Sequence, residues 1–157
     1  MEATLLIKTI ERLIEESGKF IDTYMQTDED RRIANGNVSV CIIDDDGNIY
    51  GRMFGNNKVR ARESFRVAWT KASQVHITGY KTGEFEKKAF NEEIDETTFG
   101  IERPDYIGWE GGQPLYLKDG TRLSVGFSGF RGVIDLEIMV KALAIVEGGV
   151  IKLKKLI

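Results

Sequence analysis

The pattern of apolar residues along the chain predicts three long helices. In the first, over residues 2–26, one stripe at helical spacing contains Leu6, Ile10, Leu13, Ile14, Ile21, Tyr24 and Met25. The second, over residues 59–77, carries a narrow stripe of mostly small residues: Ala61, Phe65, Ala68, Ala72 and Val75. Small residues allow a helix to lie close to a sheet. A third helix is predicted over residues 133–146, before Gly148-Gly149.

Two β-hairpins are predicted between these helices. Strands over residues 37–44 and 49–54 flank the turn residues Asp45-Asp46-Gly47-Asn48. Strands over residues 114–118 and 122–127 flank Asp119-Gly120, a strong hairpin signal. Two hairpins with helices to cover them predict an α+β fold with a mainly antiparallel sheet. The tail, residues 150–157, alternates in part and can add a strand.

Residues 80–112 are the least regular part of the chain. A short helix is predicted near residues 84–92, after which glycines and Pro104 interrupt every pattern. A long irregular segment inside a compact domain often serves as a lid or binding loop. We therefore look for a ligand site beside it.

Composition narrows the classes of protein to which this chain can belong. Its 157 residues suit one domain, and its net charge of -3 argues against a general nucleic-acid binder. No run of about 18 apolar residues predicts a membrane span. The single cysteine, Cys41, lies in an apolar run and predicts a buried thiol without a disulfide. We expect a cytoplasmic protein with neither nucleic-acid nor membrane partners.

Two segments resemble a known family of small domains. In residues 62–72 the residues Ser64, Ala68, Lys71 and Ala72 match the second helix of GlcG/HbpS-like domains, which also occur at the C-terminus of PduO-type adenosyltransferases. The second segment contains Gly111-Gly112-Gln113-Pro114-Leu115-Tyr116, then Asp119-Gly120, Val125-Gly126, Ser128-Gly129 and Asp135. It resembles the closing hairpin and helix start of the same family.

The resemblance covers roughly residues 36–145 of a single domain over residues 1–157, between the long helix 2–26 and an extension at 148–157. It implies a profilin-like fold, with a five-stranded antiparallel sheet and helices on both faces. It also implies a homo-oligomer and an association with haem or other cofactor metabolism. The irregular segment, with Trp109-Glu110, departs from the shorter version in the family. Exposed apolar residues off the main stripe of the first helix, Leu5 and Phe20, also favour self-association.

His76 is the only histidine and hence the first candidate for an axial haem ligand. It follows Phe65, Trp69 and Ala72 at helical spacing, which suits a planar macrocycle. The alternative is a helix-end histidine that caps carbonyls or packs at an interface. If His76 is not the ligand, a tyrosine such as Tyr80 or Tyr106 is the next candidate.

A basic group at the start of the second helix predicts an anion site. Five bases accompany one acid, Glu63: Lys58, Arg60, Arg62, Arg66 and Lys71. Arg62 and Arg66 lie one turn apart and can hold one carboxylate or phosphate, if residues 100–112 fold over them. The alternatives are a solvated or subunit-pairing face, or neutralisation by residues 84–110, which contain nine acids and three bases.

Three functions remain open, since no zinc, Walker, Rossmann or nucleophile-elbow pattern occurs. The first is a binding protein for a small anionic ligand, with haem or a related tetrapyrrole foremost, held by Arg62, Arg66, Trp69, Lys71 and His76. The second is an enzyme acting on a small anionic metabolite with Asp105 or Glu110 and Lys71. The third is a structural oligomer subunit without a ligand.

Overall fold

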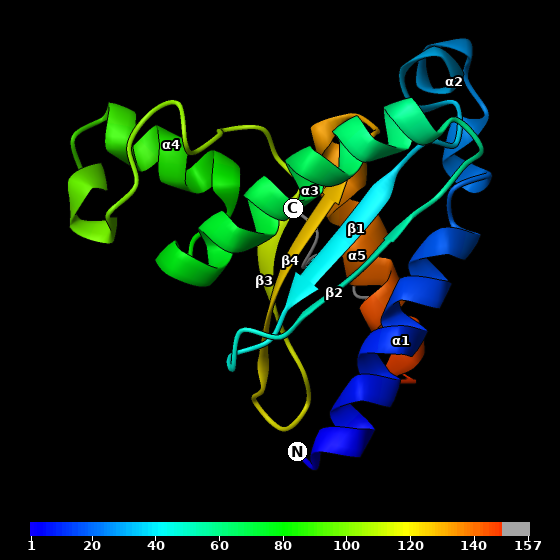
Figure 1. Ribbon diagram of the computed structural model, residues 1–157, viewed down its shortest axis with the longest axis horizontal. Coiled ribbons are helices and arrows are strands. Elements are labelled where there is room, and N and C mark those ends of the chain that lie inside the picture. Colours follow the sequence, from blue (N-terminus) through cyan, green and yellow to red (C-terminus); the bar gives the residue numbers. More distant parts are fainter. Residues whose placement is uncertain (149–157) are drawn as a thin grey trace.

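The computed structural model describes residues 1–148 as helices packed on both faces of one sheet (Figure 1). In chain order the elements are α1 (Ala3–Lys19), η1 (Thr23–Met25), α2 (Asp28–Ala34), β1 (Ser39–Ile43), β2 (Ile49–Met53), α3 (Lys58–Thr78), α4 (Thr82–Phe90), η2 (Glu96–Phe99), β3 (Gly112–Tyr116), β4 (Arg122–Ser128) and α5 (Gly132–Val146). The predicted α+β class, both hairpins and the helices at 59–77 and 133–146 are confirmed within a few residues.

The sheet has the strand order β2-β1-β4-β3, with every neighbouring pair antiparallel. Cys41 of β1 lies opposite Gly51 of β2 on one side and Gly126 of β4 on the other. The described residues thus hold four strands, whereas the family resemblance implies five. The tail at 150–157, where an added strand is predicted, lies outside the described residues.

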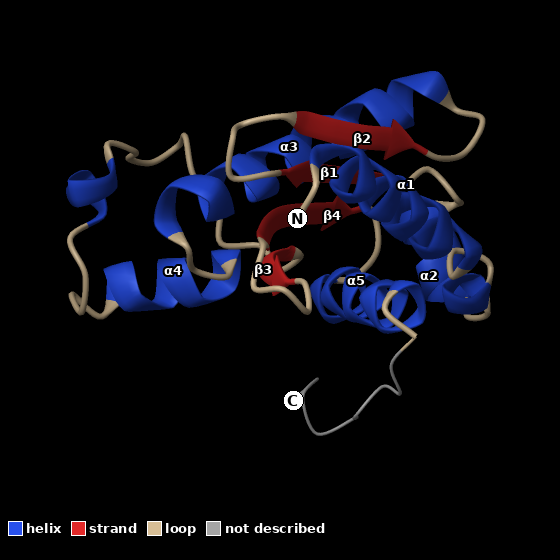
Figure 2. Ribbon diagram, turned by 90° about the horizontal axis from the view of Figure 1, so that it is seen from below, coloured by secondary structure: helices blue, strands red, loops and turns tan. Residues whose placement is uncertain are grey.

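One face of the sheet carries the larger core, against α1 and α5 (Figure 2). Alternate residues of β1 and β4 point to it because side chains in a strand alternate between faces. They pack with Ile10 and Leu13 of α1 and with Ile138 and Met139 of α5, and none of these four is exposed.

The opposite face is covered by α3, which lies very close to β4. A Cβ atom added at Gly126 would stand 2.0 Å from the carbonyl oxygen of Ala68. Ser64 Oγ donates a hydrogen bond to the Ser128 carbonyl at 2.7 Å, again between α3 and β4. The small-residue stripe predicted for this helix therefore faces the sheet, as expected.

The prediction that the first helix extends over residues 2–26 is wrong, because the helix is shorter. α1 ends at Lys19, and next to this end Gly18 lies so close to the ring of Phe54 that an added Cβ would stand 2.6 Å from it. Phe20, expected on an outer face, instead packs against the core. A separate helix, α2, begins after Thr27, whose hydroxyl accepts a hydrogen bond from the Asp30 amide.

Residues 80–107 form a small unit beyond β3, at one side of the sheet (Figure 1). Its centre is Phe85 of α4, which is fully buried and meets the rings of Phe99 and Tyr106 edge-on at 5.7 and 5.2 Å. The short helix predicted near residues 84–92 is α4, while η2 was not predicted. None of the helices in residues 1–148 is long and apolar enough to cross a membrane.

Candidate functional site

A cavity of about 530 Å³ lies between the outer face of α3 and the loop at residues 101–109. We call it the tryptophan cavity, and it is lined by Arg66, Val67, Trp69, Thr70, Ser73, Gln74, Ile77, Ile101, Pro104, Asp105, Ile107 and Trp109. Its volume lies within the range usual for small-molecule sites, about 300–1,000 Å³. The prediction of a cavity between this helix and the irregular segment is therefore confirmed.

Gln74 fixes the loop to α3. Its side chain is 2% exposed and forms two hydrogen bonds with one loop residue: Nε2 donates to the Ile107 carbonyl at 2.9 Å, and Oε1 accepts from the Ile107 amide at 2.9 Å. Thr82 Oγ1 of α4 donates to the Trp109 carbonyl at 2.6 Å. These hydrogen bonds hold the loop at Ile107 and at Trp109, shortly before β3 begins. Because the loop forms one wall of the cavity, the cavity is part of the folded structure.

The lining of the tryptophan cavity is largely apolar with a charged rim. Trp69 and Trp109, the only two tryptophans of the chain, are 45% and 67% exposed there. Arg66 is the only cation among the lining residues and Asp105 the only acid. Arg66 also forms a surface ion pair with Glu63 of the same helix, and this pairing lowers the pKa of Glu63. Such a lining offers flat apolar contact together with one guanidinium and one carboxylate.

A second cavity, of about 480 Å³, adjoins the first across Val67 and Trp109, which line both. We call it the lysine cavity, and its other lining residues are Lys71, Glu110, Ser128, Gly129, Phe130, Gly132 and Asp135. Here α3 supplies Lys71 and the start of α5 supplies Asp135.

Lys71 and Asp135 form a buried ion pair, with side chains only 3% and 2% exposed. Lys71 Nζ donates to Asp135 Oδ2 at 3.3 Å and to the Phe127 carbonyl at 2.9 Å, while Asp135 Oδ1 accepts from the Phe130 amide at 3.0 Å. Burial lowers the pKa of Lys71 and raises the pKa of Asp135 from their ordinary values. Both shifts favour the uncharged forms of the two groups.

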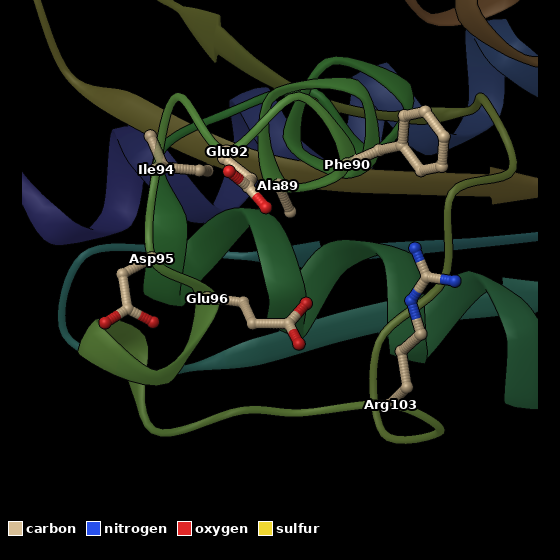
Figure 3. Close-up of a pocket in the computed structure, with 7 residues that line it drawn as sticks. All are labelled: Ala89, Phe90, Glu92, Ile94, Asp95, Glu96 and Arg103. Atoms are coloured by element: carbon tan, nitrogen blue, oxygen red, sulfur yellow. The ribbon is translucent and has the colours of Figure 1, made fainter.

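Two further cavities are open hollows at the surface. One, of about 510 Å³, lies between α4 and the loop that follows it and is lined by Glu92, Asp95, Glu96 and Arg103, of which Glu96 extends toward Arg103 (Figure 3). Arg103 Nε is already bound to the Tyr106 hydroxyl at 2.8 Å, and Tyr106 donates in turn to Glu96. Within residues 1–148, no group of three or more potential metal ligands gathers. We therefore describe these acids as surface residues of the unit formed by residues 80–107.

The other hollow lies at the start of α3, against α2, and is lined by Asp28, Arg31, Arg32, Asn35 and Arg60. Two of its arginines have partners, because Arg31 pairs with Asp28 and Arg60 donates to the Ile33 carbonyl. Asn57 Oδ1 accepts from the Arg60 amide and so caps the helix itself. The anion site was predicted at the start of the helix over residues 59–77, which is α3. Its basic residues are divided between two places, because Arg60 lines this hollow and Arg66 lines the tryptophan cavity.

The predicted site residues fall into three places. Arg66, Trp69 and Asp105 share the tryptophan cavity. Lys71 and Glu110 share the lysine cavity, so that Lys71 has Glu110 rather than Asp105 beside it. Arg62 and His76 line neither cavity, and in the described part of the chain neither Arg62 nor Arg66 pairs with an acid from residues 84–110.

His76 lies near the C-terminal end of α3 and is half-buried. Its Nδ1 atom is buried and has no hydrogen-bond partner within residues 1–148, and its carbonyl accepts from Arg122 at 3.3 Å. The next residue, Ile77, lines the tryptophan cavity. His76 is thus a neighbour of the cavity with one unsatisfied ring nitrogen.

Two features of the site escaped the sequence analysis. The Lys71–Asp135 pair joins residues 64 positions apart, although both belong to the segments that resemble the family. Gln74 carries no sequence signal of its own except its spacing four residues after Thr70 and three before Ile77, which also line the cavity.

No protein-family model matches the chain, and no curated protein matches its sequence. Solved structures do match its fold. A double mutant of Streptomyces reticuli HbpS superposes with a TM-score of 0.58 at 18% identity, over 88% of this chain and 84% of that one. The PduOC:haem complex gives a TM-score of 0.60 at 16% identity, over 92% and 93% of the two chains.

Protein ORFY of Klebsiella pneumoniae gives a TM-score of 0.64 at 14% identity, over 92% of this chain and 90% of that one. The chain therefore has the fold of the HbpS-like structures, as its resemblance to GlcG/HbpS-like domains predicted. At these identities the similarity concerns the fold.

Proposed function

We propose that this protein binds a small flat organic anion in the tryptophan cavity, with haem or a related tetrapyrrole as the foremost ligand. The observation that carries the proposal is the gathering of both tryptophans and Arg66 around one cavity of about 530 Å³. Indole rings supply flat apolar contact, and a guanidinium receives a carboxylate. PduOC, which shares this fold at 16% identity, has been solved as a complex with haem, which supports a tetrapyrrole.

The lining fits the macrocycle better than it fits the iron. No histidine, cysteine, methionine or tyrosine is among the residues of this cavity, although these are the usual axial ligands of haem iron. His76 immediately precedes the lining residue Ile77 and has an unsatisfied Nδ1 within the described residues, so we propose it as the candidate ligand of the iron. The tryptophans and Arg66 would then hold the ring, and His76 the metal.

Intrinsic fluorescence tests the binding directly, because both tryptophans of the chain line the same cavity. Titration with ferric haem and with metal-free protoporphyrin should quench the emission in parallel with ligand absorbance. Single-tryptophan variants, Trp69→Phe and Trp109→Phe, should each retain quenching. Emission that stays unchanged in the presence of either ligand would contradict binding at this cavity.

Arg66→Ala has a closely matched control. Arg66 pairs with Glu63 and Arg31 pairs with Asp28, each three residues apart on an exposed helix face. Arg66→Ala should weaken tetrapyrrole binding by up to about fivefold, because Arg66 is 68% exposed and an exposed ionic contact contributes about 0–1 kcal/mol. Arg31→Ala should leave the affinity unchanged. Equal effects from the two variants would indicate a nonspecific contribution of charge.

His76→Ala separates the iron from the ring. If His76 binds the iron, the variant should shift the Soret band and weaken ferric haem binding, while protoporphyrin binding stays the same. An unchanged spectrum and affinity would remove His76 from the site and leave Tyr80 or Tyr106 as candidates. Tyr106 is the poorer of these, because its side chain is 4% exposed and its hydroxyl is held by Arg103 and Glu96.

A further inference from the structure

The lysine cavity contains a nucleophile that the proposed function does not use. Lys71 is 2% exposed yet lines a cavity of about 480 Å³ together with its partner Asp135. The backbone leaves room for the amine, because a Cβ atom added at Gly111 would stand 2.6 Å from Lys71 Nζ. Lysines that are paired only for stability need no cavity beside them.

The surroundings favour an uncharged amine beside an uncharged acid. Burial lowers the pKa of Lys71 and raises the pKa of Asp135, and the two groups lie 3.3 Å apart. Because Lys71 and Asp135 share one proton, a fraction of the molecules holds it on Asp135. In that fraction Lys71 is a neutral amine and Asp135 a carboxylic acid. A neutral lysine amine is a nucleophile, whereas an ammonium ion is not.

We propose that Lys71 forms a Schiff base with a small carbonyl compound that enters the lysine cavity, with Asp135 as the proton donor. The lone pair of Nζ attacks the carbonyl carbon as the C=O π bond breaks, and a proton passes from the nitrogen to the oxygen, which becomes the hydroxyl of a carbinolamine. Asp135 protonates this hydroxyl, which leaves as water while the N–C bond becomes double. The products are a protonated imine on Lys71, water and the Asp135 carboxylate, so that atoms and charges balance.

The cavity indicates which carbonyl compounds fit. Val67, Trp109 and Phe130 give it apolar walls, and Gly132, the first residue of α5, lines one end. The N-terminus of a helix favours a carboxylate, whereas the carboxylate of Glu110 at the same cavity disfavours one. In either case the ligand is a small aldehyde or ketone. A neutral aldehyde and a 2-oxo acid are the two compounds to compare, because they differ in whether they carry a carboxylate.

Borohydride trapping tests the proposal on the unaltered protein. The protein is incubated with acetaldehyde or with pyruvate, reduced with borohydride, digested and mapped by mass spectrometry. Lys71 should be alkylated at least about tenfold faster than Lys141, which is also ion-paired, to Glu137 at 3.5 Å, but is 26% exposed and has its pKa raised by its hydrogen bond to Tyr24. Preference for acetaldehyde or for pyruvate then shows whether Glu110 or the start of α5 dominates.

Asp135→Asn serves as the second variant because its shape is nearly unchanged. It should retain the alkylation of Lys71 but slow it about tenfold or more, since the proton donor is gone. Folding is checked by circular dichroism. Alkylation of Lys71 no faster than that of Lys141 in the unaltered protein would overturn the proposal, whatever the result of the tetrapyrrole titration, which reports on the other cavity.

Discussion

At the scale of single residues, the absence of a side chain is as important here as any group present. Gly126 lies where α3 crosses β4, and the 2.0 Å distance from its added Cβ to the Ala68 carbonyl leaves no room for a methyl group. The neighbouring atoms belong to helix backbone, which cannot move like a flexible side chain. The helix lies this close to the sheet because Ala68 and Ala72 are also small.

Gly126→Ala is therefore expected to destabilise the protein by about 1–3 kcal/mol or more, as overpacking does. The free energy of unfolding can be measured by urea denaturation. The matched control is Gly83→Ala in α4, where an added Cβ would meet the flexible Glu110 side chain at 3.2 Å and the Gly108 carbonyl oxygen at 3.5 Å, an ordinary contact distance. This control should be close to neutral, since alanine favours a helix over glycine. Equal losses in the two variants would contradict the close packing of α3 on β4.

At the scale of elements, one ion pair joins α2 to the start of α5. Arg131 Nε and Nη2 donate to the two oxygens of Asp30 at 2.9 and 3.1 Å. Asp30 also accepts from the Thr27 hydroxyl at 2.7 Å. The hydrogen bond from Thr27 and then that from Arg131 lower the pKa of Asp30 below its ordinary value of 3.8. The carboxylate form is thus the one that stabilises the fold.

The pH dependence of this contribution follows from the sign of the shift. A carboxyl group whose pKa is lower in the folded protein stabilises it fully above pH 3.8 and loses this effect as the pH falls through the lowered pKa. Asp30→Asn should reduce the urea midpoint at pH 7. The difference from the unaltered protein should shrink below about pH 3.8. A difference that is constant from pH 7 to pH 3 would show that the ionised pair does not contribute.

The ion pair within α3 competes with the ligand for the same guanidinium. Arg66 is bound by Glu63, and both side chains are exposed, at 68% and 63%. Glu63→Gln should therefore tighten the binding of a tetrapyrrole carboxylate by at most about fivefold, because exposed pairs contribute about 0–1 kcal/mol. Asp28→Asn, which frees Arg31 instead, should leave binding unchanged. Weaker binding in Glu63→Gln would show that Glu63 positions Arg66 for the ligand.

The elements differ in how far the sequence alone predicts them. α3 and the two hairpins follow from local signals, a stripe of small residues and turn residues that tolerate positive φ. The end of α1 at Lys19 does not, because apolar residues continue at helical spacing through Ile21 and Met25. There Gly18 lies against Phe54, which directly follows β2, and a local pattern does not reveal such a contact between distant segments.

The same limit applies to the site. A ligand cavity beside α3 was predictable because the irregular segment at 80–112 needed a surface on which to fold. The grouping within it was not, since Lys71 and Asp135 meet only when α3 and the start of α5 both come to the end of β4. A helical wheel places Arg62 and Arg66 on one side of α3. Only the position of residues 101–109 shows that, of these two arginines, Arg66 lines the cavity and Arg62 does not.

At the scale of the whole molecule, the sheet ends in an exposed edge. β2 pairs with β1 on one side, and no strand within residues 1–148 pairs with its other side. Ile49 and Met53 project from the α3-facing side of the sheet, opposite Ile43 and Ser39 of β1, and are 56% and 54% exposed. Proteins usually protect such edges with proline, lysine or a covering element.

We expect a second copy of this chain to cover the edge, by antiparallel pairing of β2 with β2 of the other copy. Such pairing would satisfy the free backbone groups and bury Ile49 and Met53, which a monomer leaves in water. Sedimentation velocity of the full chain at micromolar concentrations should therefore show a dimer or larger assembly. Met53→Lys places a charge at the edge and should shift the distribution toward monomer. Leu5→Lys, a matched change at a residue of α1 that is 53% exposed, should not. A monomer at every concentration would exclude self-association, and dissociation by Leu5→Lys alone would place the interface on α1.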